Sequence, residues 1–211
     1  MNRFKANGTT AAMGVTRRTI LQGCVVVTTA GLGSSIAMPS FAAQATELAL
    51  TPSCKPDEAP TRAGTEGPYF TPSSPAKSDF RADAAGEAFV IMGWVLTRDC
   101  RPIANAVIDL WHADANGEYD NEGYRLRGHQ STDAAGRYVF QTIVPGPYDD
   151  RTRHYHVKVR APGGRLLTTQ LYFPGEARNA RDFLFDGRLL MQIESTSTGR
   201  IGRFDFVLAD A

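Results

Sequence analysis

Ala106-Val107-Ile108-Asp109-Leu110-Trp111 is the stretch that most directly indicates the fold. In an extended chain successive side chains point to opposite faces, so Ile108 and Leu110 would share one face and the alternate residues the other. An earlier run, Phe89-Val90-Ile91-Met92-Gly93-Trp94-Val95-Leu96, is also short, apolar and β-branched, and a turn segment over 97–102 follows it. Such runs, bounded by Gly, Pro, Asn and Asp, are typical of β-strands.

The same signature recurs along the rest of the chain. Further candidate strands are Arg137 to Thr142, His154 to Arg160, Leu167 to Tyr172 and Arg203 to Leu208. No stretch longer than about ten residues shows a helical apolar period, and the one weak helix candidate is Ala177 to Leu184. The pattern predicts an all-β fold, either a sandwich or a barrel.

Length and charge exclude some classes of partner. The 211 residues suit one ordinary domain, or one domain plus a tail. The formal net charge is +1, and Lys and Arg are not gathered into a long block. A nucleic-acid-binding surface or a polybasic membrane patch would need such clustering. We therefore expect no nucleic-acid partner.

The N-terminus has the organisation of an export signal. An arginine pair in Thr16-Arg17-Arg18-Thr19-Ile20-Leu21 precedes an uncharged run to about Met38, and Pro39-Ser40-Phe41-Ala42-Ala43 offers a small-residue cleavage site. The pair resembles a twin-arginine signal over residues 1–42. An ordinary secretory signal or an uncleaved anchor is the alternative. Because the run is rich in Gly, Ser and Thr, we expect a periplasmic or extracellular protein with no stable membrane anchor.

The mature chain begins with a short polar region. Residues 43–62 are rich in Ala, Thr, Pro and charge, which predicts a flexible lead-in to a domain over 63–211. After removal of the signal, Cys54 and Cys100 are the remaining cysteines. In an oxidising compartment they could form one disulfide, or remain as two unpaired thiols.

Two histidines and two tyrosines could carry metal chemistry. His154 and His156 are two residues apart in a predicted strand, so both imidazoles would lie on one face. Such a pair also occurs as two exposed histidines on a surface strand. Tyr148 follows the stiff turn Pro145-Gly146-Pro147, and Tyr119 closes a loop after Trp111. Either tyrosine, taken alone, would be interpreted as a packed aromatic with a hydrogen-bonded hydroxyl.

An ordered series of motifs resembles the intradiol ring-cleavage dioxygenase family, which includes protocatechuate 3,4-dioxygenase and catechol 1,2-dioxygenase. The resemblance spans residues 64–208, and the short segment between Tyr148 and His154 is most similar to compact, often exported members. The motifs that carry it are Thr65-Glu66-Gly67-Pro68-Tyr69-Phe70, Ala106 to Tyr119, Arg127 to Asp133, Gly136 to Ile143, Pro145 to Tyr148, Arg151, His154 to Val157 and Thr169 to Phe173.

The resemblance implies an all-β fold, a β-sandwich of mainly antiparallel strands with long active-site loops, and a role for each matching residue. It implies a non-heme Fe(III) centre with Tyr119, Tyr148, His154 and His156 as ligands, in which Tyr148 is also the base. Arg151 and Gln170 would lie beside the substrate ring, and Gly67, Pro68 and Tyr69 would form one wall of its pocket. The implied reaction opens a catechol-type ring with O2, between the hydroxyl-bearing carbons, to a cis,cis-muconate-type diacid. The family also allows a homo-oligomer.

The residue types suit that metal. Phenolate is a hard, anionic donor, and two of them favour ferric iron, whereas two histidines and a carboxylate would suit iron(II). Tyr124 is the nearest rival of Tyr119 as a ligand. Asp149 and Asp150 depart from the family's pattern, and would disfavour a carboxylated substrate if they face the pocket.

Two other functions are compatible with parts of the sequence. One is a non-catalytic β-sandwich binding domain that has lost its metal, since a fold alone does not determine function. The other is a zinc- or iron(II)-dependent hydrolase that uses His154, His156 and a carboxylate such as Asp150. The choice among catechol, hydroxyquinol, protocatechuate, chlorinated catechols and lignin-derived catechols depends on pocket shape and is left open by the sequence.

Overall fold

The computed structural model describes residues 54–197 and 199–209. The predicted export signal and the first part of the predicted lead-in lie outside this range. None of the helices in the described part of the chain is long and apolar enough to span a membrane. The described elements are β1 (Ala88–Thr97), β2 (Val107–Trp111), β3 (Arg127–Ser131), β4 (Arg137–Ile143), β5 (His154–Arg160), β6 (Leu167–Tyr172), η1 (Ala177–Ala180), η2 (Gly187–Leu189), β7 (Gln192–Thr196), β8 (Gly199–Arg203) and β9 (Phe206–Leu208).

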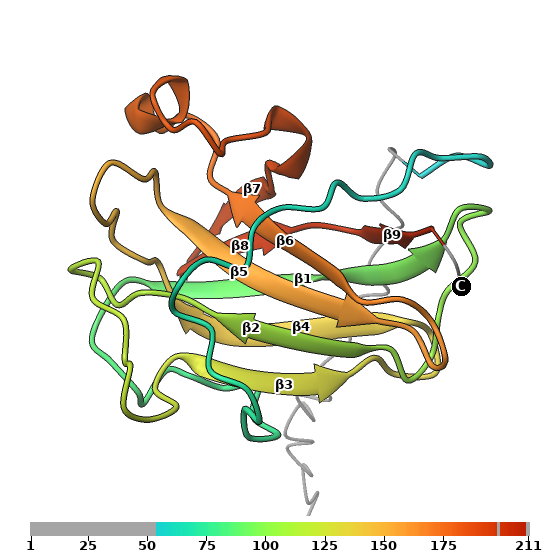
Figure 1. The fold of residues 1–211 in the computed structure, drawn as a ribbon, viewed down its shortest axis with the longest axis horizontal. Helices are drawn as coiled ribbons and strands as arrows, with labels where there is room; N and C mark the ends of the chain where they lie inside the picture. Colours follow the sequence, from blue (N-terminus) through green and yellow to red (C-terminus); the bar gives the residue numbers. More distant parts are fainter. Residues whose placement is uncertain (1–53, 198, 210–211) are drawn as a thin grey trace, which may run out of the picture. The chain divides into compact units, whose positions relative to one another are not determined.

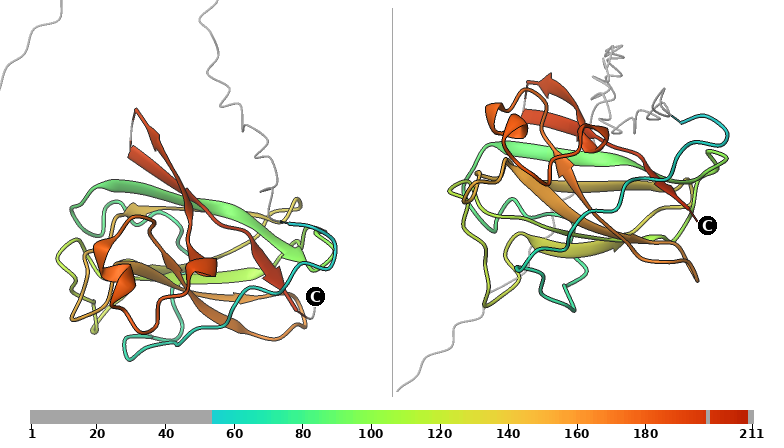
Figure 2. Two further views of the ribbon diagram at one scale, coloured as in Figure 1. Left: turned by 90° about the horizontal axis from the view of Figure 1, so that it is seen from above. Right: turned by 45° about the horizontal axis from the view of Figure 1, so that its top comes forward.

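The strands form two sheets that pack face to face. One sheet has the order β4-β1-β8-β7, with β9 also paired to β1, and the other has the order β3-β2-β5-β6 (Figure 1). Figure 2 shows the two layers from other sides. Strand pairs are antiparallel except for β1 with β8 and β1 with β9. The predicted all-β sandwich of mainly antiparallel strands is confirmed.

Apolar side chains from both sheets fill the space between them. Ile91 and Phe140 contribute from the first sheet, and Ile108, Tyr155 and Val157 from the second, each at most 1% exposed. Every second residue of β5 therefore belongs to the core, and its alternate residues belong to the outer face. Truncating a fully buried ring such as Phe140 to Ala is expected to cost about 3 to 5 kcal/mol.

Two predicted elements near the C-terminus are wrong in extent. The strand expected from Arg203 to Leu208 is split into β8 and β9, because the Asp205 side chain interrupts it. Asp205 Oδ1 accepts a hydrogen bond from the Trp94 main-chain N–H at 3.1 Å. In a continuous strand pair, a main-chain carbonyl of the neighbouring strand would accept this bond. The helix candidate from Ala177 to Leu184 forms only the short 3₁₀ helix η1.

The lead-in is tied to the sandwich at two points. Cys54 and Cys100 form a disulfide with their Cα atoms 5.8 Å apart, which decides between the two alternatives for these cysteines. Further along, the Thr61 N–H donates to Val207 O at 2.9 Å, and the Val207 N–H donates to Thr61 Oγ1 at 2.8 Å. The following segment, 62–70, then crosses the outer face of the β3-β2-β5-β6 sheet (Figure 1).

Candidate metal centre

Strand register brings polar and aromatic side chains into one row on the outer face of the β3-β2-β5-β6 sheet. Residues directly opposite each other in an antiparallel pair project to the same face. Arg127 of β3 lies opposite Trp111 of β2, Trp111 lies opposite His156 of β5, and His156 lies opposite Gln170 of β6. His154 lies opposite Tyr172 in the next row. Six side chains are therefore positioned by three strand pairings.

The two histidines face each other with their ring nitrogens. His154 Nε2 and His156 Nε2 are 3.1 Å apart, and the residues are 3% and 0% exposed. His154 Nδ1 lies 2.7 Å from Thr152 O, so the Nδ1–H donates there and Nε2 keeps its lone pair. Burial, together with the charge of Arg151, lowers the pKa of His154 to about 4. Burial and His154 hold the pKa of His156 well below its usual range.

The ring of His156 is held in place by close packing. Trp111 lies nearly parallel to it, with ring centroids 4.9 Å apart and 9° between the planes. Gly67 also approaches the imidazole, and a Cβ at that position would lie 3.1 Å from His156 Cε1. Gly67 has a φ of 74°, in the left-handed region that glycine adopts without strain. The predicted pocket wall thus reaches one of the predicted ligands.

Both predicted tyrosine ligands lie beside this histidine pair. The rings of Tyr119 and Tyr148 are 5.3 Å apart and nearly perpendicular. Tyr148 lies 5.7 Å from His154, and Tyr119 lies 6.0 Å from His156, between ring centroids. Tyr124 is instead 37% exposed, and its hydroxyl donates to Pro72 O at 2.9 Å. The structure therefore brings Tyr119, and not its rival, to the cluster.

The two tyrosine-bearing loops pack closely against each other. The Gly146 N–H donates to Asp114 O at 2.7 Å, which joins the Pro145–Pro147 turn to the loop that carries Tyr119. A Cβ at Gly117 would lie 2.3 Å from Pro147 O, so any larger residue there would force the loops apart. Glycine at this contact allows both phenols to reach the histidines.

Arg151 and Gln170 form a hydrogen-bonded group beside the histidines. Arg151 Nη2 donates to Gln170 Oε1 at 2.6 Å and to the Tyr172 hydroxyl at 3.2 Å. Gln170 Nε2 donates to Thr65 O at 3.1 Å and lies 3.4 Å from His156 Nδ1. Tyr172 was not predicted as a site residue, although its place two residues after Gln170 on the same strand face was a usable signal.

A second arginine joins the wall of the site to the loop of Tyr119. Arg127 is 1% exposed, and its Nε and Nη2 donate to Asp120 O at 3.0 and 2.6 Å. Its Nη1 donates to Tyr69 O. A planar guanidinium with donors on both sides can bridge two carbonyls in this way, whereas an ammonium group cannot hold the same geometry. Sequence patterns alone did not reveal this role.

The donor set fits a metal ion. Burial, followed by the charge of Tyr148, raises the pKa of Tyr119, and burial also raises the pKa of Tyr148 against the opposing effect of Arg151. These phenols would ionise only beside a strong positive charge such as a metal. Two nitrogen ligands bound at right angles at about 2.1 Å would lie roughly 3 Å apart, which matches the histidine pair.

A carboxylate-based metal site is not assembled. Among residues 54–197 and 199–209, no three His, Cys, Asp or Glu side chains are grouped so that they could hold a metal ion. The alternative set of His154, His156 and Asp150 therefore does not form, and Asp150 is exposed. The remaining donors near the histidines are phenols, which favour a ferric ion over zinc or iron(II).

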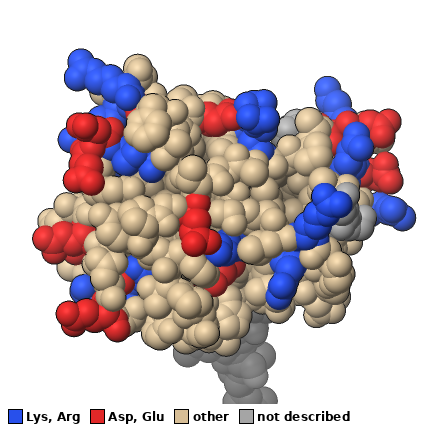
Figure 3. Space-filling view, viewed as in Figure 1, with Lys and Arg blue, Asp and Glu red and all other residues tan. Residues whose placement is uncertain are grey.

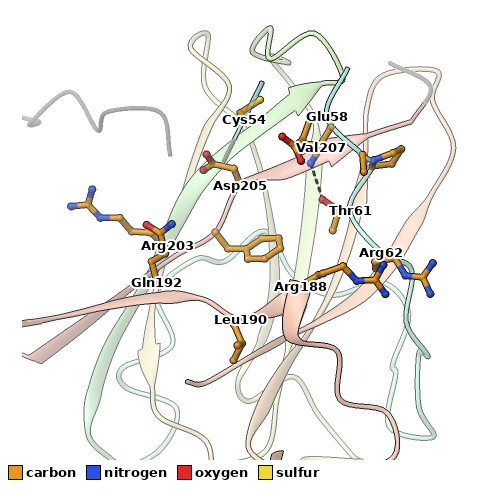
Figure 4. A pocket seen from close by; sticks show the side chains of 13 residues that line it. Cys54, Glu58, Thr61, Arg62, Arg188, Leu190, Gln192, Arg203, Asp205 and Val207 are labelled. Carbon is orange, nitrogen blue, oxygen red and sulfur yellow. Dashed lines mark hydrogen bonds between the residues drawn. The ribbon is translucent and has the colours of Figure 1, made fainter. Parts of the chain in front are cut away.

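A cavity of about 360 Å³ lies elsewhere, between the lead-in and β7 to β9 (Figure 4). None of the candidate site residues lines it. Its arginines are paired with acids: Arg62 and Arg188 contact Asp186, and Arg203 contacts Glu194.

On the face shown in Figure 3, charged side chains of both signs are interspersed, and neither sign forms a continuous patch. This agrees with the absence of a basic block in the sequence.

Comparisons with known proteins point to one family. The family model described as Dioxygenase matches residues 65–209. A catechol 1,2-dioxygenase of Acinetobacter lwoffii is 32% identical over 168 residues, which is 63% of this chain and 61% of that protein. A protocatechuate 3,4-dioxygenase beta chain of Burkholderia cepacia is 34% identical over 48% of this chain and 51% of its own. The chain thus spans about half to three fifths of the length of these relatives.

Solved structures agree with the sequence relatives. The dioxygenase domain of a dioxygenase–carbohydrate-binding protein fusion from Streptomyces sp. SirexAA-E is 49% identical, with a TM-score of 0.71, over 72% of this chain and 100% of that one. The 3-chlorocatechol 1,2-dioxygenase of Rhodococcus opacus 1CP is 28% identical, with a TM-score of 0.66, over 72% of this chain and 74% of that one.

Proposed function

The chain belongs to the intradiol ring-cleavage dioxygenase family, and from this premise we propose that it opens the ring of a catechol-type aromatic with O2. Cleavage falls between the two hydroxyl-bearing carbons, both oxygen atoms enter the product, and the product is a cis,cis-muconate-type diacid. One observation carries the proposal. The two neutral imidazoles, whose Nε2 atoms are 3.1 Å apart, lie beside the phenols of Tyr119 and Tyr148. A domain that had lost its metal would be expected to lack part of this set.

The proposed cofactor is iron(III), held by Tyr119, Tyr148, His154 and His156. When bound, ferric iron supplies Lewis acidity that binds a catecholate and prepares it for attack by O2. The two phenolates neutralise most of the charge of the ion, which stabilises the ferric state. His154 would act through Nε2, since Thr152 O accepts the hydrogen bond of its Nδ1–H.

Other side chains of this chain bind and orient the substrate. Tyr148 Oη accepts a proton from a catechol hydroxyl as the substrate binds, a general-base role. Arg151 stabilises the negative charge that develops on the ring, because its guanidinium is already fixed beside the histidines by Gln170 and Tyr172. Gly67, Pro68 and Tyr69 form one wall of the pocket.

Iron content, colour and product together test the proposal. The purified protein should contain iron and be red-brown, because phenolate bound to iron(III) gives a charge-transfer band. A panel of catechol, hydroxyquinol, protocatechuate and chlorinated catechols should show at least one substrate whose product carries both atoms of labelled O2. A colourless protein with stoichiometric zinc and no ring cleavage on this panel would contradict the proposal.

We also propose that the protein is exported in a folded state by the twin-arginine route. The Arg17-Arg18 pair of the predicted signal supports this. The Cys54–Cys100 disulfide supports an oxidising compartment. Replacing both arginines by Lys should retain the protein in the cytoplasm, as followed by cell fractionation. Unchanged export of that variant would favour an ordinary secretory signal.

A further inference from the structure

One carboxylate behind the candidate site is buried although its neighbours are exposed. Asp182 lies in the segment after η1, and its side chain is 0% exposed. The residue that follows, Phe183, is 85% exposed, and Arg181 is also exposed. Burying an ionised carboxylate costs several kcal/mol unless it is paired and hydrogen-bonded. The position of Asp182 therefore requires partners that compensate this cost.

Those partners belong to the proposed active site. Arg151 Nε donates to both carboxylate oxygens of Asp182, at 2.9 and 2.8 Å. The Thr152 N–H donates to Asp182 Oδ2 at 3.0 Å, and the Leu184 N–H donates to Oδ1 at 2.9 Å. Asp182 thus binds both the side chain of Arg151 and the main chain of the next residue, just before His154.

The guanidinium of Arg151 is consequently held on two edges. Its Nε edge faces Asp182, and its Nη2 corner faces Gln170 Oε1 and the Tyr172 hydroxyl. Gln170 and Tyr172 lie opposite His156 and His154 in the strand ladder. Two fixed edges determine the plane of a rigid guanidinium. Loss of the Nε contact would leave that plane free to turn about the Nη2 contact.

We propose that Asp182 is a positioning residue that holds the guanidinium of Arg151 beside the two histidines for ring cleavage. This inference rests on the proposed function. Asp182 does not touch the reacting atoms, and its effect on the reaction is exerted through Arg151. The ion pair with Arg151 also offsets the cost of burying both charged groups.

A double-mutant cycle in the iron-loaded, full-length protein tests the proposal. The variants are Asp182→Asn, Arg151→Gln and the double variant, each assayed for kcat and KM with the best catechol of the panel. Asp182→Asn should lower kcat by about 100-fold, the scale expected for a misplaced active-site group, with KM changed by less than about threefold. In the Arg151→Gln background the same change should lower kcat by less than about twofold.

Two further variants separate positioning from folding. Asp182→Glu keeps the charge but moves the carboxylate by one methylene group, and should remain impaired. Asp83→Asn is the matched control: Asp83 accepts from the Leu126 N–H at 2.7 Å and from Lys77 Nζ at 2.7 Å, and so ties a loop without contacting Arg151. It should lower the melting temperature comparably while kcat stays within about twofold, since neither of the hydrogen bonds that it breaks involves a residue of the candidate site.

A readout independent of activity is the NMR signal of the Arg151 side-chain Nε–H in the metal-free protein, assigned by its loss in Arg151→Gln. The signal should be slow to exchange with solvent in the wild type, and fast in Asp182→Asn. An unchanged signal, a wild-type kcat for Asp182→Asn, or a full multiplicative loss in the double variant would each overturn the proposal. A wild type inert to every catechol would overturn the proposed function instead, and the Nε–H signal would then decide alone whether Asp182 orders Arg151.

Discussion

The ring of Tyr69 lies flat on the ring of Tyr119, with centroids 4.4 Å apart and 17° between the planes. Tyr69 also meets Tyr148 edge to face at 5.6 Å. The predicted pocket wall and both predicted tyrosine ligands are therefore one aromatic cluster. Arg127 links the two segments of this cluster, because it donates hydrogen bonds to Tyr69 O and to Asp120 O, which is next to Tyr119. A change at Arg127 should consequently affect the wall and the ligand loop together.

Arg127→Met is predicted to lower the free energy of unfolding by about 2 to 4 kcal/mol, because a buried guanidinium is removed and two half-buried carbonyls lose a charged donor. Iron should also bind more weakly, since the loop of Tyr119 loses its connection to the Tyr69 segment. Urea unfolding and iron titration measure the two effects. Arg127→Lys serves as the control: it keeps the charge, but cannot bridge both carbonyls, and should recover only part of the loss. Full recovery by Lys would show that charge alone matters.

Tyr148→Phe is predicted to lower kcat by at least about 100-fold, because the proposed base at the ring hydroxyl is removed. The charge-transfer colour should also change, since one of two phenolates is lost. Tyr124→Phe is the matched control, because Tyr124 is exposed and its hydroxyl bonds only to Pro72 O among the described contacts. Activity of Tyr148→Phe equal to that of Tyr124→Phe would remove Tyr148 from the mechanism.

The sequence was sufficient where local pattern determines structure. The strands over His154–Arg160 and Leu167–Tyr172 have the predicted bounds, because apolar alternation and flanking turns mark them clearly. The alternation also placed the two histidines on one face. β3 was not predicted as a strand, because its sequence Arg127-Gly128-His129-Gln130-Ser131 is polar. It forms at an edge of the sheet, where side chains need not be apolar.

What the sequence could not reveal are contacts between distant segments. Asp182 reaches Arg151 across 31 residues, and Arg127 reaches Tyr69 across 58. No periodic pattern in the sequence predicts such contacts, because they depend on how the loops fold back over the sheet. The same holds for Asp205, whose side chain breaks a strand that the apolar pattern predicts to be continuous. Local rules fail at these points because tertiary contacts decide them.

Acid sensitivity is predicted for a buried histidine outside the candidate site. His112 is 1% exposed, with Nδ1 2.7 Å from Ala113 O and Nε2 2.7 Å from Thr142 Oγ1. Burial is the main cause that lowers its pKa from 6.5 to about 4. Between these two pH values the unfolded chain binds a proton that the folded protein does not bind. The contribution of His112 to the free energy of unfolding is therefore fully present above pH 6.5 and is lost as the pH falls toward 4.

His112→Gln should reduce the dependence of the free energy of unfolding on pH by up to about 1.4 kcal/mol per pH unit. Urea unfolding of wild type and variant across the same pH range measures it. The buried His154 and His156 contribute in the same direction in both proteins, so the difference between the two curves isolates His112. Parallel curves between pH 6.5 and pH 4 would contradict the assignment.

The disulfide is predicted to matter for stability and not for catalysis. Cys54 and Cys100 are 46 residues apart, and a cross-link closing a loop of that length stabilises by about 4 kcal/mol in the chain-entropy estimate. Replacing both by Ser should lower the free energy of unfolding by up to that amount. Wild type unfolded in reductant should behave like the variant. The kcat should stay within about twofold, because Thr61 and Gly64 hold the segment on β9 and β6 independently of the disulfide. A large loss of kcat in the folded variant would show that the disulfide itself positions the wall at Gly67 to Tyr69.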